Sequence, residues 1–412
     1  MRHLCTVLSI ALLAGCGSTV ASPDASTGDA SVADRVAPVD PDYAPYAPAS
    51  ARPTAISLGG NHACARFDNG RVYCWGNGFF GGLGNGVSVT AQPRPTAVRG
   101  LRDVSAVTSG ATFTCALSGP VASCWGSNAW GQLGDGTHRD GLYAAPVVGL
   151  PANVRALSAG GALLVGDACA LLDDTRVLCW GSNTDQSASE RVPLLGVGET
   201  SETVTTPSLV RDLTNVQQVS LGDVHICALL VDGTVRCWGW NNHAQCGRDG
   251  AMTIGAPSTV AGLDDVVEVA AGQFHTCARR RDGRVSCWGD DTWGQLGDGA
   301  SSQRAAPAPV TTVTGATQVA TGDDFSCAII ANGAVTCWGR NRHGQLGDGT
   351  TGDARSPVMV RDLTGATMIS LGDEHACALL ADRAVRCWGR NDLAQLGDAS
   401  RTDRLTPVAV AF

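Results

Sequence analysis

The stretch VATGDDFSCAIIANGAVTCWGRNRHGQLGDGT, from Val319 to Thr350, sets a plan that the rest of the chain repeats. Its Trp-Gly pair recurs along the chain at intervals of 50 to 58 residues. The tryptophans of these pairs are Trp75, Trp125, Trp180, Trp238, Trp288, Trp338 and Trp388. A fixed period of this length indicates an array of supersecondary units, each too small to bury a core alone, so the seven copies must pack on one another.

Each copy is predicted to consist of β-strands. Short apolar and β-branched runs, such as Ala334 to Trp338, are separated by Asn-Gly or Asp-Gly, and no run has the period and length of a helix. We expect four antiparallel strands per blade, the first being the Pro-led segment ahead of each copy, such as Pro357 to Val360. A closed ring of seven such sheets is an all-β, seven-bladed β-propeller.

The segment from Trp338 to Gly349 reads Trp-Gly-x-Asn-x-x-Gly-Gln-Leu-Gly-Asp-Gly, which resembles the regulator of chromosome condensation (RCC) repeat. The period of the copies is similar to that of this family as well. The resemblance covers about Pro53 to Phe412 and implies a propeller fold. RCC-type propellers include a nuclear exchange factor for a small GTPase and a secreted inhibitor of β-lactamases, so the resemblance leaves the function open.

The first 15 residues resemble a lipoprotein-type signal peptide. Arg2 precedes an apolar run from Leu4 to Leu13, which is too short to cross a bilayer as a helix. The sequence Leu-Ala-Gly-Cys ending at Cys16 resembles a bacterial lipobox, in which the cysteine is lipidated; a secretory signal cleaved elsewhere is the alternative. Gly17 resembles the residue found in lipoproteins sorted to an outer membrane. We therefore expect an exported, membrane-anchored lipoprotein at the outer membrane or cell surface.

Residues 16–52 are expected to form a flexible, lipid-anchored linker ahead of the propeller at 53–412. They are rich in Ser, Ala, Asp, Thr and Pro and contain almost no large aliphatic residues. An arm ordered against the propeller through Tyr43 and Tyr46 is the alternative. Across the whole chain, 38 acidic residues outnumber 29 basic ones, and this net charge of −9 argues against nucleic-acid binding.

Fourteen of the 17 cysteines fall as one pair in each copy. The pairs are Cys64/Cys74, Cys115/Cys124, Cys169/Cys179, Cys227/Cys237, Cys277/Cys287, Cys327/Cys337 and Cys377/Cys387. Of the others, Cys5 leaves with the signal peptide and Cys16 is the lipid site. Cys246 takes the Leu position of Gly-Gln-Leu-Gly, where we expect a small buried hydrophobe instead of a reactive thiol.

Hairpin geometry predicts that these pairs are disulfides. In the fourth copy a three-residue loop centred on Asp232 places Cys227 opposite Cys237, with Cα atoms about 4.5 Å apart in a non-hydrogen-bonded pair. In the second copy the loop and the cysteine spacing both shorten by one residue, which keeps Cys115 opposite Cys124. Zinc is the alternative, but no pair has the Cys-x-x-Cys spacing of a zinc site. Seven disulfides also fit an exported protein.

Other repeated polar residues are interpreted as structural, so no metal or cofactor is predicted. Four histidines precede the first cysteine of their copies by two residues, namely His62, His225, His275 and His375. A metal ring is the alternative, but repeat symmetry spaces such residues around the whole propeller. The Gly-Asp-Gly turns at Asp135, Asp298 and Asp348 suggest calcium, yet Asp favours such turns without a metal.

Two stretches are candidate binding surfaces. Trp130 and Trp293 lie five residues after the Trp of their copies, where aromatics either rim a binding face or pack on the Gly-Gln-Leu-Gly turn. The third copy lacks that motif and has the longest interval to the next copy, 58 residues. Its apolar residues Val192, Leu194 and Leu195 are predicted to present an anchor on a loop, a passive loop being the alternative.

The strand from Pro407 to Val410 is predicted to close the ring by pairing into the first blade. It is followed by no further copy, and the prolines of Pro45 to Pro48 ahead of copy one make a poor strand.

We interpret the chain as a non-enzymatic, monomeric binding scaffold. Its expected partner is an unknown protein or another extracellular macromolecule, and its membrane contact is through the lipid only. The alternative is an extracellular hydrolase or lyase with a site at the channel mouth. The acidic residues of copy three, which are the place to seek such a site, are Asp167, Asp173, Asp174, Asp185 and Glu190.

Overall fold

The computed structural model describes residues 40, 43–162, 165–184 and 193–412. These residues belong to one compact unit, Ala37–Phe412. Within the described ranges, no helix has the length and apolar character that crossing a membrane requires. The predicted signal peptide, the lipid site Cys16 and most of the predicted linker lie outside these ranges and stay predictions.

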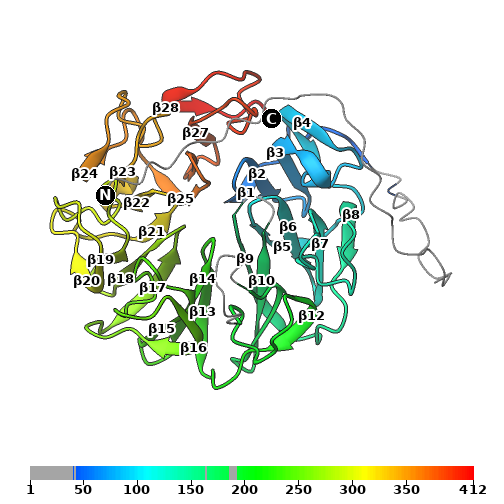
Figure 1. The fold of residues 1–412 in the computed structure, drawn as a ribbon. Coiled ribbons are helices and arrows are strands. Elements are labelled where there is room, and N and C mark those ends of the chain that lie inside the picture. Colours follow the sequence, from blue (N-terminus) through cyan, green and yellow to red (C-terminus); the bar gives the residue numbers. More distant parts are fainter. Residues whose placement is uncertain (1–39, 41–42, 163–164, 185–192) are drawn as a thin grey trace, which may run out of the picture. The chain divides into compact units, whose positions relative to one another are not determined.

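The described residues form seven four-stranded antiparallel sheets around a central axis (Figure 1). This arrangement confirms the predicted seven-bladed β-propeller. We number the blades 1 to 7 in chain order, so that each blade holds the copy of the same number. The first strand of each blade is innermost, since these strands contact one another from blade to blade around the ring.

Blades 1 to 3 include one short 3₁₀ turn. Blade 1 comprises β1 (Pro53–Leu58), β2 (His62–Phe67), β3 (Val72–Gly78), the 3₁₀ turn η1 (Phe79–Gly81) and β4 (Val89–Ala97). Blade 2 comprises β5 (Val104–Ser109), β6 (Phe113–Ser118), β7 (Val121–Gly126) and β8 (Gly141–Pro146). Blade 3 comprises β9 (Val154–Gly160), β10 (Asp167–Leu172), β11 (Val177–Ser182) and β12 (Thr203–Leu209).

Blades 4 to 7 follow the same plan. Blade 4 comprises β13 (Val216–Leu221), β14 (His225–Leu230), β15 (Val235–Trp240) and β16 (Thr253–Thr259). Blade 5 comprises β17 (Val266–Ala271), β18 (His275–Arg280), β19 (Val285–Gly289) and β20 (Arg304–Pro309). Blade 6 comprises β21 (Gln318–Thr321), β22 (Phe325–Ile329), the 3₁₀ turn η2 (Ala331–Gly333), β23 (Val335–Gly339) and β24 (Ala354–Met359). Blade 7 comprises β25 (Ala366–Leu371), β26 (His375–Leu380), β27 (Val385–Gly389) and β28 (Arg404–Ala409).

The Pro-led segments are the fourth strands of their own blades, which corrects the predicted grouping. For example, β24 pairs with β23, the strand that carries Trp338, and Val358 lies opposite Cys337. The reason is local, because the Gly-Gln-Leu-Gly turn folds the chain back beside the strand that it has just left. The blade is therefore complete before the chain reaches the next copy.

The predicted closure of the ring by the last strand is wrong for the same reason. Strand β28 pairs with β27 in blade 7, where Val408 lies opposite Cys387. Blade 1 already has four strands of its own, because β1 pairs with β2 and places Ser57 opposite Cys64. The first and last blades therefore meet by packing, as every other pair of neighbouring blades does.

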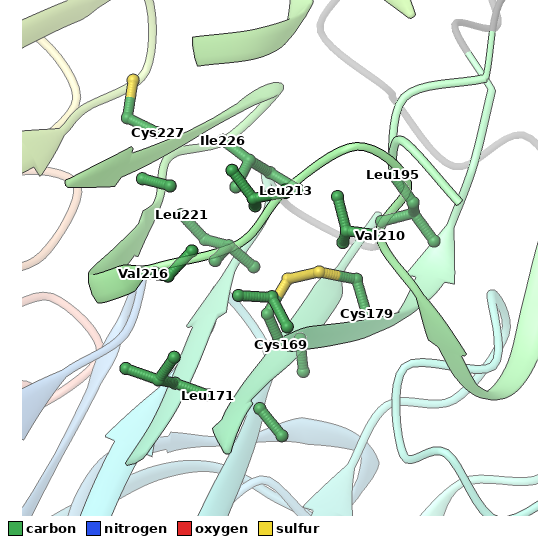
Figure 2. Packing of buried hydrophobic residues seen from close by; sticks show 14 of the residues in the cluster. Cys169, Leu171, Cys179, Leu195, Val210, Leu213, Val216, Leu221, Ile226 and Cys227 are labelled. Atoms are coloured by element: carbon green, nitrogen blue, oxygen red, sulfur yellow. A yellow bond between two sulfur atoms is a disulfide. The ribbon is translucent and has the colours of Figure 1, made fainter. Parts of the chain in front are cut away.

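The seven predicted disulfides are confirmed, and each joins the second and third strands of a blade. Their Cα atoms lie 4.0 to 4.1 Å apart, slightly closer than the predicted distance of about 4.5 Å. Figure 2 shows one of them, Cys169–Cys179, among apolar side chains of blades 3 and 4, so the disulfides lie within the core that joins neighbouring blades. The bonds are Cys64–Cys74, Cys115–Cys124, Cys169–Cys179, Cys227–Cys237, Cys277–Cys287, Cys327–Cys337 and Cys377–Cys387.

The third strand of each blade has an irregularity that the sequence analysis did not predict. In blade 1 the register of β3 against β4 shifts between Cys74 and Gly76, and in blade 5 the register of β19 against β20 shifts between Cys287 and Gly289. These glycines have φ angles of 96° and 107°, which only glycine adopts readily. The regular pairing of the third strand with the fourth thus ends at the disulfide cysteine. The pairing of the third strand with the second keeps the predicted register, with Cys74 opposite Cys64.

A buried tryptophan holds each blade to the preceding one. The seven tryptophans of the Trp-Gly pairs are fully buried. In five blades the indole Nε1 donates to the carbonyl oxygen of the Gln in the preceding blade's turn, as Trp338 does to Gln295 at 2.9 Å. Trp125 donates in the same way to Gly82 at 3.0 Å. The repeated turn is therefore a link between blades as well as a turn.

The described end of the predicted linker packs on blades 1 and 2. The Asp40 carboxylate lies 2.7 Å from Arg71 and 2.6 Å from Arg102, and the hydrogen bond from Arg71 lowers the pKa of Asp40 to about 2. The Arg99 guanidinium lies over the Tyr43 ring at 4.5 Å. Tyr46 is 55% exposed. Tyr43 therefore packs on the propeller, as the alternative of an ordered arm predicts.

Candidate functional site: the channel face

The segments between the first and second strands of all seven blades meet at one end of the central channel. They surround a cavity of about 100 Å³ on the ring axis. At this end a glycine ends or directly follows the first strand of each blade and nearly touches its counterpart in the next blade. A Cβ on Gly222, for example, would lie 2.2 Å from the carbonyl oxygen of Gly272. Only glycine permits so close an approach of neighbouring backbones.

Three aspartates directly follow these glycines and line the channel mouth, namely Asp223, Asp323 and Asp373. Gln273 Nε2 donates to Asp223 at 3.1 Å, and Asn61 Nδ2 donates to Asp373 at 3.3 Å. In the described part of the chain, no Arg or Lys forms an ion pair with any of the three. Three carboxyl groups thus share one mouth without a paired cation.

Burial, together with the charges of neighbouring carboxylates, raises the pKa values of these carboxyl groups. Burial raises the pKa of Asp373 to about 6, with the charge of Glu374 as the next cause. Burial and the nearby Asp373 raise the pKa of Asp223 well above its usual range. The pKa of Asp323 is raised by burial and by both other aspartates. Because burial and neighbouring negative charges disfavour ionisation of these carboxyl groups, a positive group at this mouth would stabilise their ionised forms.

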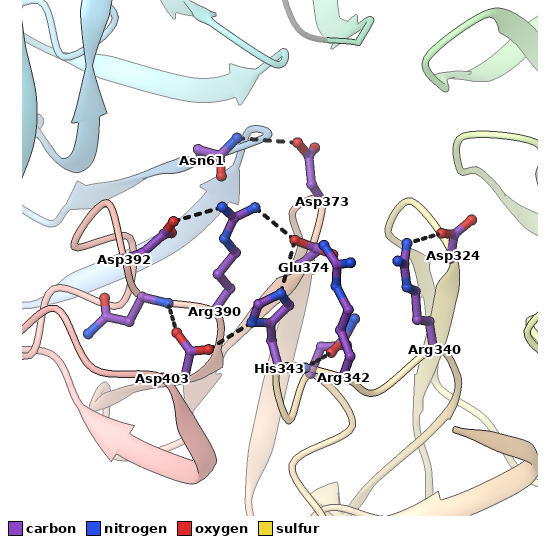
Figure 3. A network of polar contacts seen from close by, with 12 residues as sticks. Asn61, Asp324, Arg340, Arg342, His343, Asp373, Glu374, Arg390, Asp392 and Asp403 are labelled. Carbon is purple, nitrogen blue, oxygen red and sulfur yellow. Dashed lines mark hydrogen bonds and ion pairs between the residues drawn. The ribbon is translucent and has the colours of Figure 1, made fainter. Parts of the chain in front are cut away.

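A network of ion pairs continues from the channel mouth across blades 6 and 7 (Figure 3). The buried Glu374 carboxylate accepts hydrogen bonds from Arg390 at 2.8 Å and from Arg342 at 3.0 Å. The His343 ring lies 3.6 Å from Glu374 and 2.7 Å from Asp403. This part of the surface is therefore balanced in charge, in contrast to the three aspartates beside it.

Aromatic side chains lie beside this network on blades 4 to 6. Arg340 donates to Asp324 at 2.9 Å and places its guanidinium 4.7 Å from the centre of the Trp293 ring. Farther round the ring, Phe274 stacks on His243 with ring centres 4.8 Å apart and meets the edge of Trp240 at 5.5 Å. Exposed aromatics with adjacent cations are typical of protein contact surfaces.

We call this surface the channel face. Its members are Asp223, Asp323, Asp324, Asp373, Glu374, Trp240, His243, Phe274, Trp293, Arg340, Arg342, His343 and Arg390. The hairpin loops between the second and third strands lie at the other end of the strands, on the opposite face. The channel face and the face with the hairpin loops are therefore opposite ends of the propeller.

The predicted binding residues differ in exposure and do not form one surface. Trp293 is 37% exposed on the channel face, and Trp130 is partly buried at the equivalent position of blade 2. Leu195 is fully buried, so the prediction that it forms part of an exposed anchor is wrong. Leu194 lines a cavity between blades 3 and 4, and Val192 lies outside the described residues.

Leu195 is buried because blade 3 keeps the repeated turn in altered form. Its backbone N–H donates to the Asn183 side chain at 3.1 Å, as that of Leu346 donates to Asn341 at 2.9 Å in blade 6. The sequence Leu-Gly-Val-Gly from Leu195 thus replaces Leu-Gly-Asp-Gly. The extra residues of blade 3 precede this turn instead of replacing it.

The disulfide cysteines are structural residues and do not belong to the channel face. Cys74 and Cys287 are fully buried in the third strands of blades 1 and 5, and their disulfide partners Cys64 and Cys277 are fully buried as well. Cys74 packs in the core shared with blade 2, and Cys287 packs in the core shared with blade 6. These cysteines therefore hold the scaffold together without offering a contact to a partner.

The acidic residues of the enzyme alternative are not gathered into one site. Asp167 begins β10, whereas Asp173 and Asp174 lie in the hairpin loop after that strand. A strand of six residues separates the two ends by about 20 Å. Asp185 and Glu190 lie outside the described residues.

The remaining predicted polar residues have structural partners, except His375, whose two ring nitrogens are buried without a hydrogen-bond partner in the described part of the chain. His62, His225 and His275 are fully buried, and each ring forms a 2.8 Å hydrogen bond to a Thr or Ser of the next blade. Cys246 is a buried free thiol, and burial raises its pKa. The turn residue Asp348 accepts hydrogen bonds from Asn341 and Thr350.

The three channel aspartates were missed by the sequence analysis. Each lies four residues before the first cysteine of its copy, in a Gly-Asp dipeptide. The recurrence of this dipeptide could have marked the three aspartates as equivalent residues. Their proximity follows only from the closed ring, which brings residues of different copies together.

The propeller, its repeated Trp-Gly strand and its Gly-Gln-Leu-Gly turn define a protein built of RCC-type repeats. A family model described as "RCC1-like domain" matches residues 144–412, and models of the "Regulator of chromosome condensation (RCC1) repeat" match residues 69–117 and 54–81. The chain therefore belongs to the RCC1-like domain family, which confirms the resemblance seen in its sequence.

Curated relatives match about half of this chain. The human regulator of chromosome condensation is 31% identical over 204 residues, which are 49% of this chain and 46% of the relative. The ultraviolet-B receptor UVR8 of Arabidopsis thaliana is 28% identical over 199 residues, which are 47% of this chain and 42% of the relative. The matched segments thus span less than half the length of either relative.

Solved structures match the fold over most of the chain. Prp20p of Saccharomyces cerevisiae has a TM-score of 0.74 and 21% identity, covering 82% of this chain and 85% of its own. Human WBSCR16 has a TM-score of 0.72 and 23% identity, covering 83% of this chain and 94% of its own. At this identity the likeness shows the fold alone.

Proposed function

We propose that this chain is a non-enzymatic, monomeric protein-binding propeller that contacts its partner through the channel face. The observation that carries the proposal is the group of Asp223, Asp323 and Asp373, whose carboxyl groups share the channel mouth with raised pKa values. A basic side chain of a partner placed there would offset their mutual repulsion. The same carboxyl groups would repel phosphate, so the partner is not a nucleic acid.

The relatives support a role in protein binding. The structural study of Prp20p names Gsp1p and histones as its binding partners, and a further structure shows yeast RCC1 bound to Kap60. Gsp1p, histones and Kap60 are partners of the yeast proteins and are not assigned to this chain. The support for this chain is that the same fold presents a protein-binding surface elsewhere.

The proposed location is the cell surface or the outer membrane, with the propeller held by a lipid at Cys16. Seven disulfides favour an oxidising compartment, because thiols stay reduced in the cytosol. The apolar run ahead of Cys16 supports export. The partner would therefore be an extracellular or periplasmic protein.

The test compares capture of proteins from extracellular and envelope fractions by three forms of the chain. In the mouth variant, Asp223, Asp323 and Asp373 are replaced by Asn. In the matched control, Asp232, Asp282 and Asp382 of the opposite face are replaced by Asn, which removes the same number of carboxyl groups. Asn also keeps the side-chain oxygen that accepts a backbone N–H in each of those loops.

We expect a protein that the wild type and the control retain and that the mouth variant loses. Its binding should weaken as salt rises, because exposed charges are screened. A protein retained equally by all three forms would place the contact surface away from the channel mouth.

A further inference from the structure

A cavity of about 230 Å³ lies between blades 3 and 4, next to the channel mouth. Apolar side chains form most of its wall, among them Leu194, Val224 and Ile226. Asp167 and Asp223 also line it. An apolar cavity of about 150 Å³ can hold benzene, so this one has room for a small organic group.

The cavity exists because blade 3 departs from the other six. In those blades a ring two residues before the first cysteine covers the glycine at the end of the first strand. These rings belong to His62, Phe113, His225, His275, Phe325 and His375. Blade 3 has Asp167 at this position, and the atoms nearest to Gly160 belong to Leu221 and Gly222 of blade 4. Asp167 therefore does not cover Gly160 as the rings do in the other blades, and it is one of the residues that line the cavity.

The next blade departs from the pattern as well. At the following interface, the His225 ring forms a 2.8 Å hydrogen bond to Thr276, which directly precedes Cys277. The residue equivalent to Thr276 in blade 4 is Ile226, which has no polar group to offer Asp167. Among the described residues, none forms a hydrogen bond with the Asp167 carboxyl except through its own backbone.

Two further polar groups of the cavity wall lack partners. Ser182 is 4% exposed, and its hydroxyl oxygen has no hydrogen-bond partner in the described part of the chain. The indole Nε1 of Trp240 is also buried without a partner there. Both side chains line the cavity. Native proteins leave few buried polar groups unpaired, so these groups point to a ligand that is bound in the cavity.

The charges around the cavity define the chemistry of that ligand. Two acidic residues line it, and no Arg, Lys or His is among the described residues of its wall. A cation on a short apolar stem matches both the carboxyl groups and the apolar wall. We propose that this cavity binds a primary alkylammonium group, with Asp167 and Ser182 as acceptors of its N–H groups and Ile226, Leu194 and Val224 around its stem.

The titration of Asp167 agrees with this assignment. Burial raises its pKa to about 8, with no charged group as a resolved cause. Asp223, whose pKa is also raised, is the other titratable group of the wall. A bound ammonium group favours the ionised carboxylate, so it would lower the pKa of Asp167 toward its usual range.

The ammonium group has two sources, a free small amine or a lysine side chain of a bound protein. The test is isothermal titration calorimetry of the purified full chain with n-butylamine, which has the length of a lysine side chain. N-Acetyl-lysine methylamide represents the lysine source, and its carbonyl oxygens can accept the Trp240 N–H. The neutral control is n-butanol, which has the same stem without the charge.

We expect n-butylamine to bind at one site per chain and n-butanol to bind at least tenfold more weakly. Tighter binding of the lysine derivative would assign the cavity to a partner's side chain, and tighter binding of n-butylamine would assign it to a free amine. Equal binding of n-butanol and n-butylamine would overturn the proposal.

Variants locate the binding in the cavity. Asp167→Asn should weaken the binding of n-butylamine about tenfold or more, because a charge-assisted hydrogen bond is lost. Asp232→Asn, in a hairpin of the opposite face, should leave it unchanged. The pair Asp167→His with Ile226→Thr rebuilds the His–Thr contact seen between blades 4 and 5 and should abolish binding in a folded protein. Unchanged affinity in either cavity variant would contradict the proposal.

Discussion

The indole Nε1 of Trp75 donates a hydrogen bond to the carbonyl oxygen of Gln395 at 3.0 Å, joining residues 320 positions apart. This contact closes the ring, and it equals the contact that Trp338 makes with Gln295 inside the ring at 2.9 Å. The closure therefore needs no exchanged strand. It repeats the indole bond that joins five of the other pairs of neighbouring blades; Trp238, at the interface of blades 3 and 4, has no such acceptor in the described part of the chain.

The last residue adds a contact that is specific to the closure. The ring of Phe412 lies 5.0 Å from Phe67 and 5.8 Å from Trp75, edge to face in both cases. We expect Phe412→Ala to lower the free energy of unfolding by about 1 kcal/mol or more, as for lost aromatic pairs. Met252→Ala, at a side chain that is 65% exposed, should change it by less than about 0.5 kcal/mol. Equal effects in urea denaturation would show that Phe412 does not hold the closure.

The disulfides predict a defined mass change. Reduction of the protein should add fourteen hydrogens, two for each of the seven bonds. Cys246 is fully buried, so it should react with an alkylating agent only after denaturation. Intact-mass spectrometry before and after reduction measures the first, and alkylation without reductant measures the second. Fourteen alkylated thiols in the native protein would contradict the pairing and the proposed compartment together.

Features that depend on neighbouring residues were predictable from the sequence. The pairing of Cys227 with Cys237 follows from the loop length and from the alternation of side chains along a strand, and both are local. The seven blades follow from the repeat. The grouping of the strands was not predictable in this way, because a Pro-led segment has the same local pattern in either of two sheets.

Features that depend on the ring were not predictable. Asp223, Asp323 and Asp373 are about fifty or more residues apart in sequence, and only the closed propeller places them at one mouth. Leu195 was assigned to an exposed tip because its turn lacks the preceding Gly-Gln. Its burial follows from the hydrogen bond to Asn183, which the sequence does not show.

Asp167 should make the stability of the protein depend on pH. Its pKa is about 8 in the folded protein, against 3.8 for the free side chain. The folded state therefore disfavours the ionised form, and stability is lost as the pH rises from about 4 to 8. Asp167→Asn cannot ionise, so its melting temperature should exceed that of the wild type by more at pH 9 than at pH 5. A constant difference between those pH values would show that the pKa of Asp167 is not raised in the folded protein.

The bonds between histidine and hydroxyl groups should contribute to stability. Thr276 donates its hydroxyl to the Gln245 carbonyl at 2.9 Å, so the oxygen accepts from the Nε2–H of His225 at 2.8 Å. Burial lowers the pKa of His225 to about 3, which keeps the ring neutral. Thr276→Val leaves this buried N–H unpaired and should cost about 1–3 kcal/mol. Thr351→Val, at an exposed position, is the control, and an equal loss there would contradict the assignment.

The interface between blades 7 and 1 lacks this bond and is therefore open to improvement. Both ring nitrogens of the buried His375 have no partner in the described part of the chain. Ala63 directly precedes Cys64, at the position where Ser326 accepts from His275 at 2.8 Å and donates to Gln295 at 3.0 Å. Ala63→Ser should therefore give His375 an acceptor and raise the free energy of unfolding by about 1 kcal/mol.

A double-mutant cycle checks that the gain comes from this bond. In a His375→Phe background, which copies the ring at Phe325, the serine has no N–H to accept and Ala63→Ser should give no gain. The stability of the four forms is measured by urea denaturation. An equal gain in both backgrounds would mean that the serine acts through some contact other than His375, and a loss in the wild-type background would mean that the closed interface has no room for the hydroxyl group.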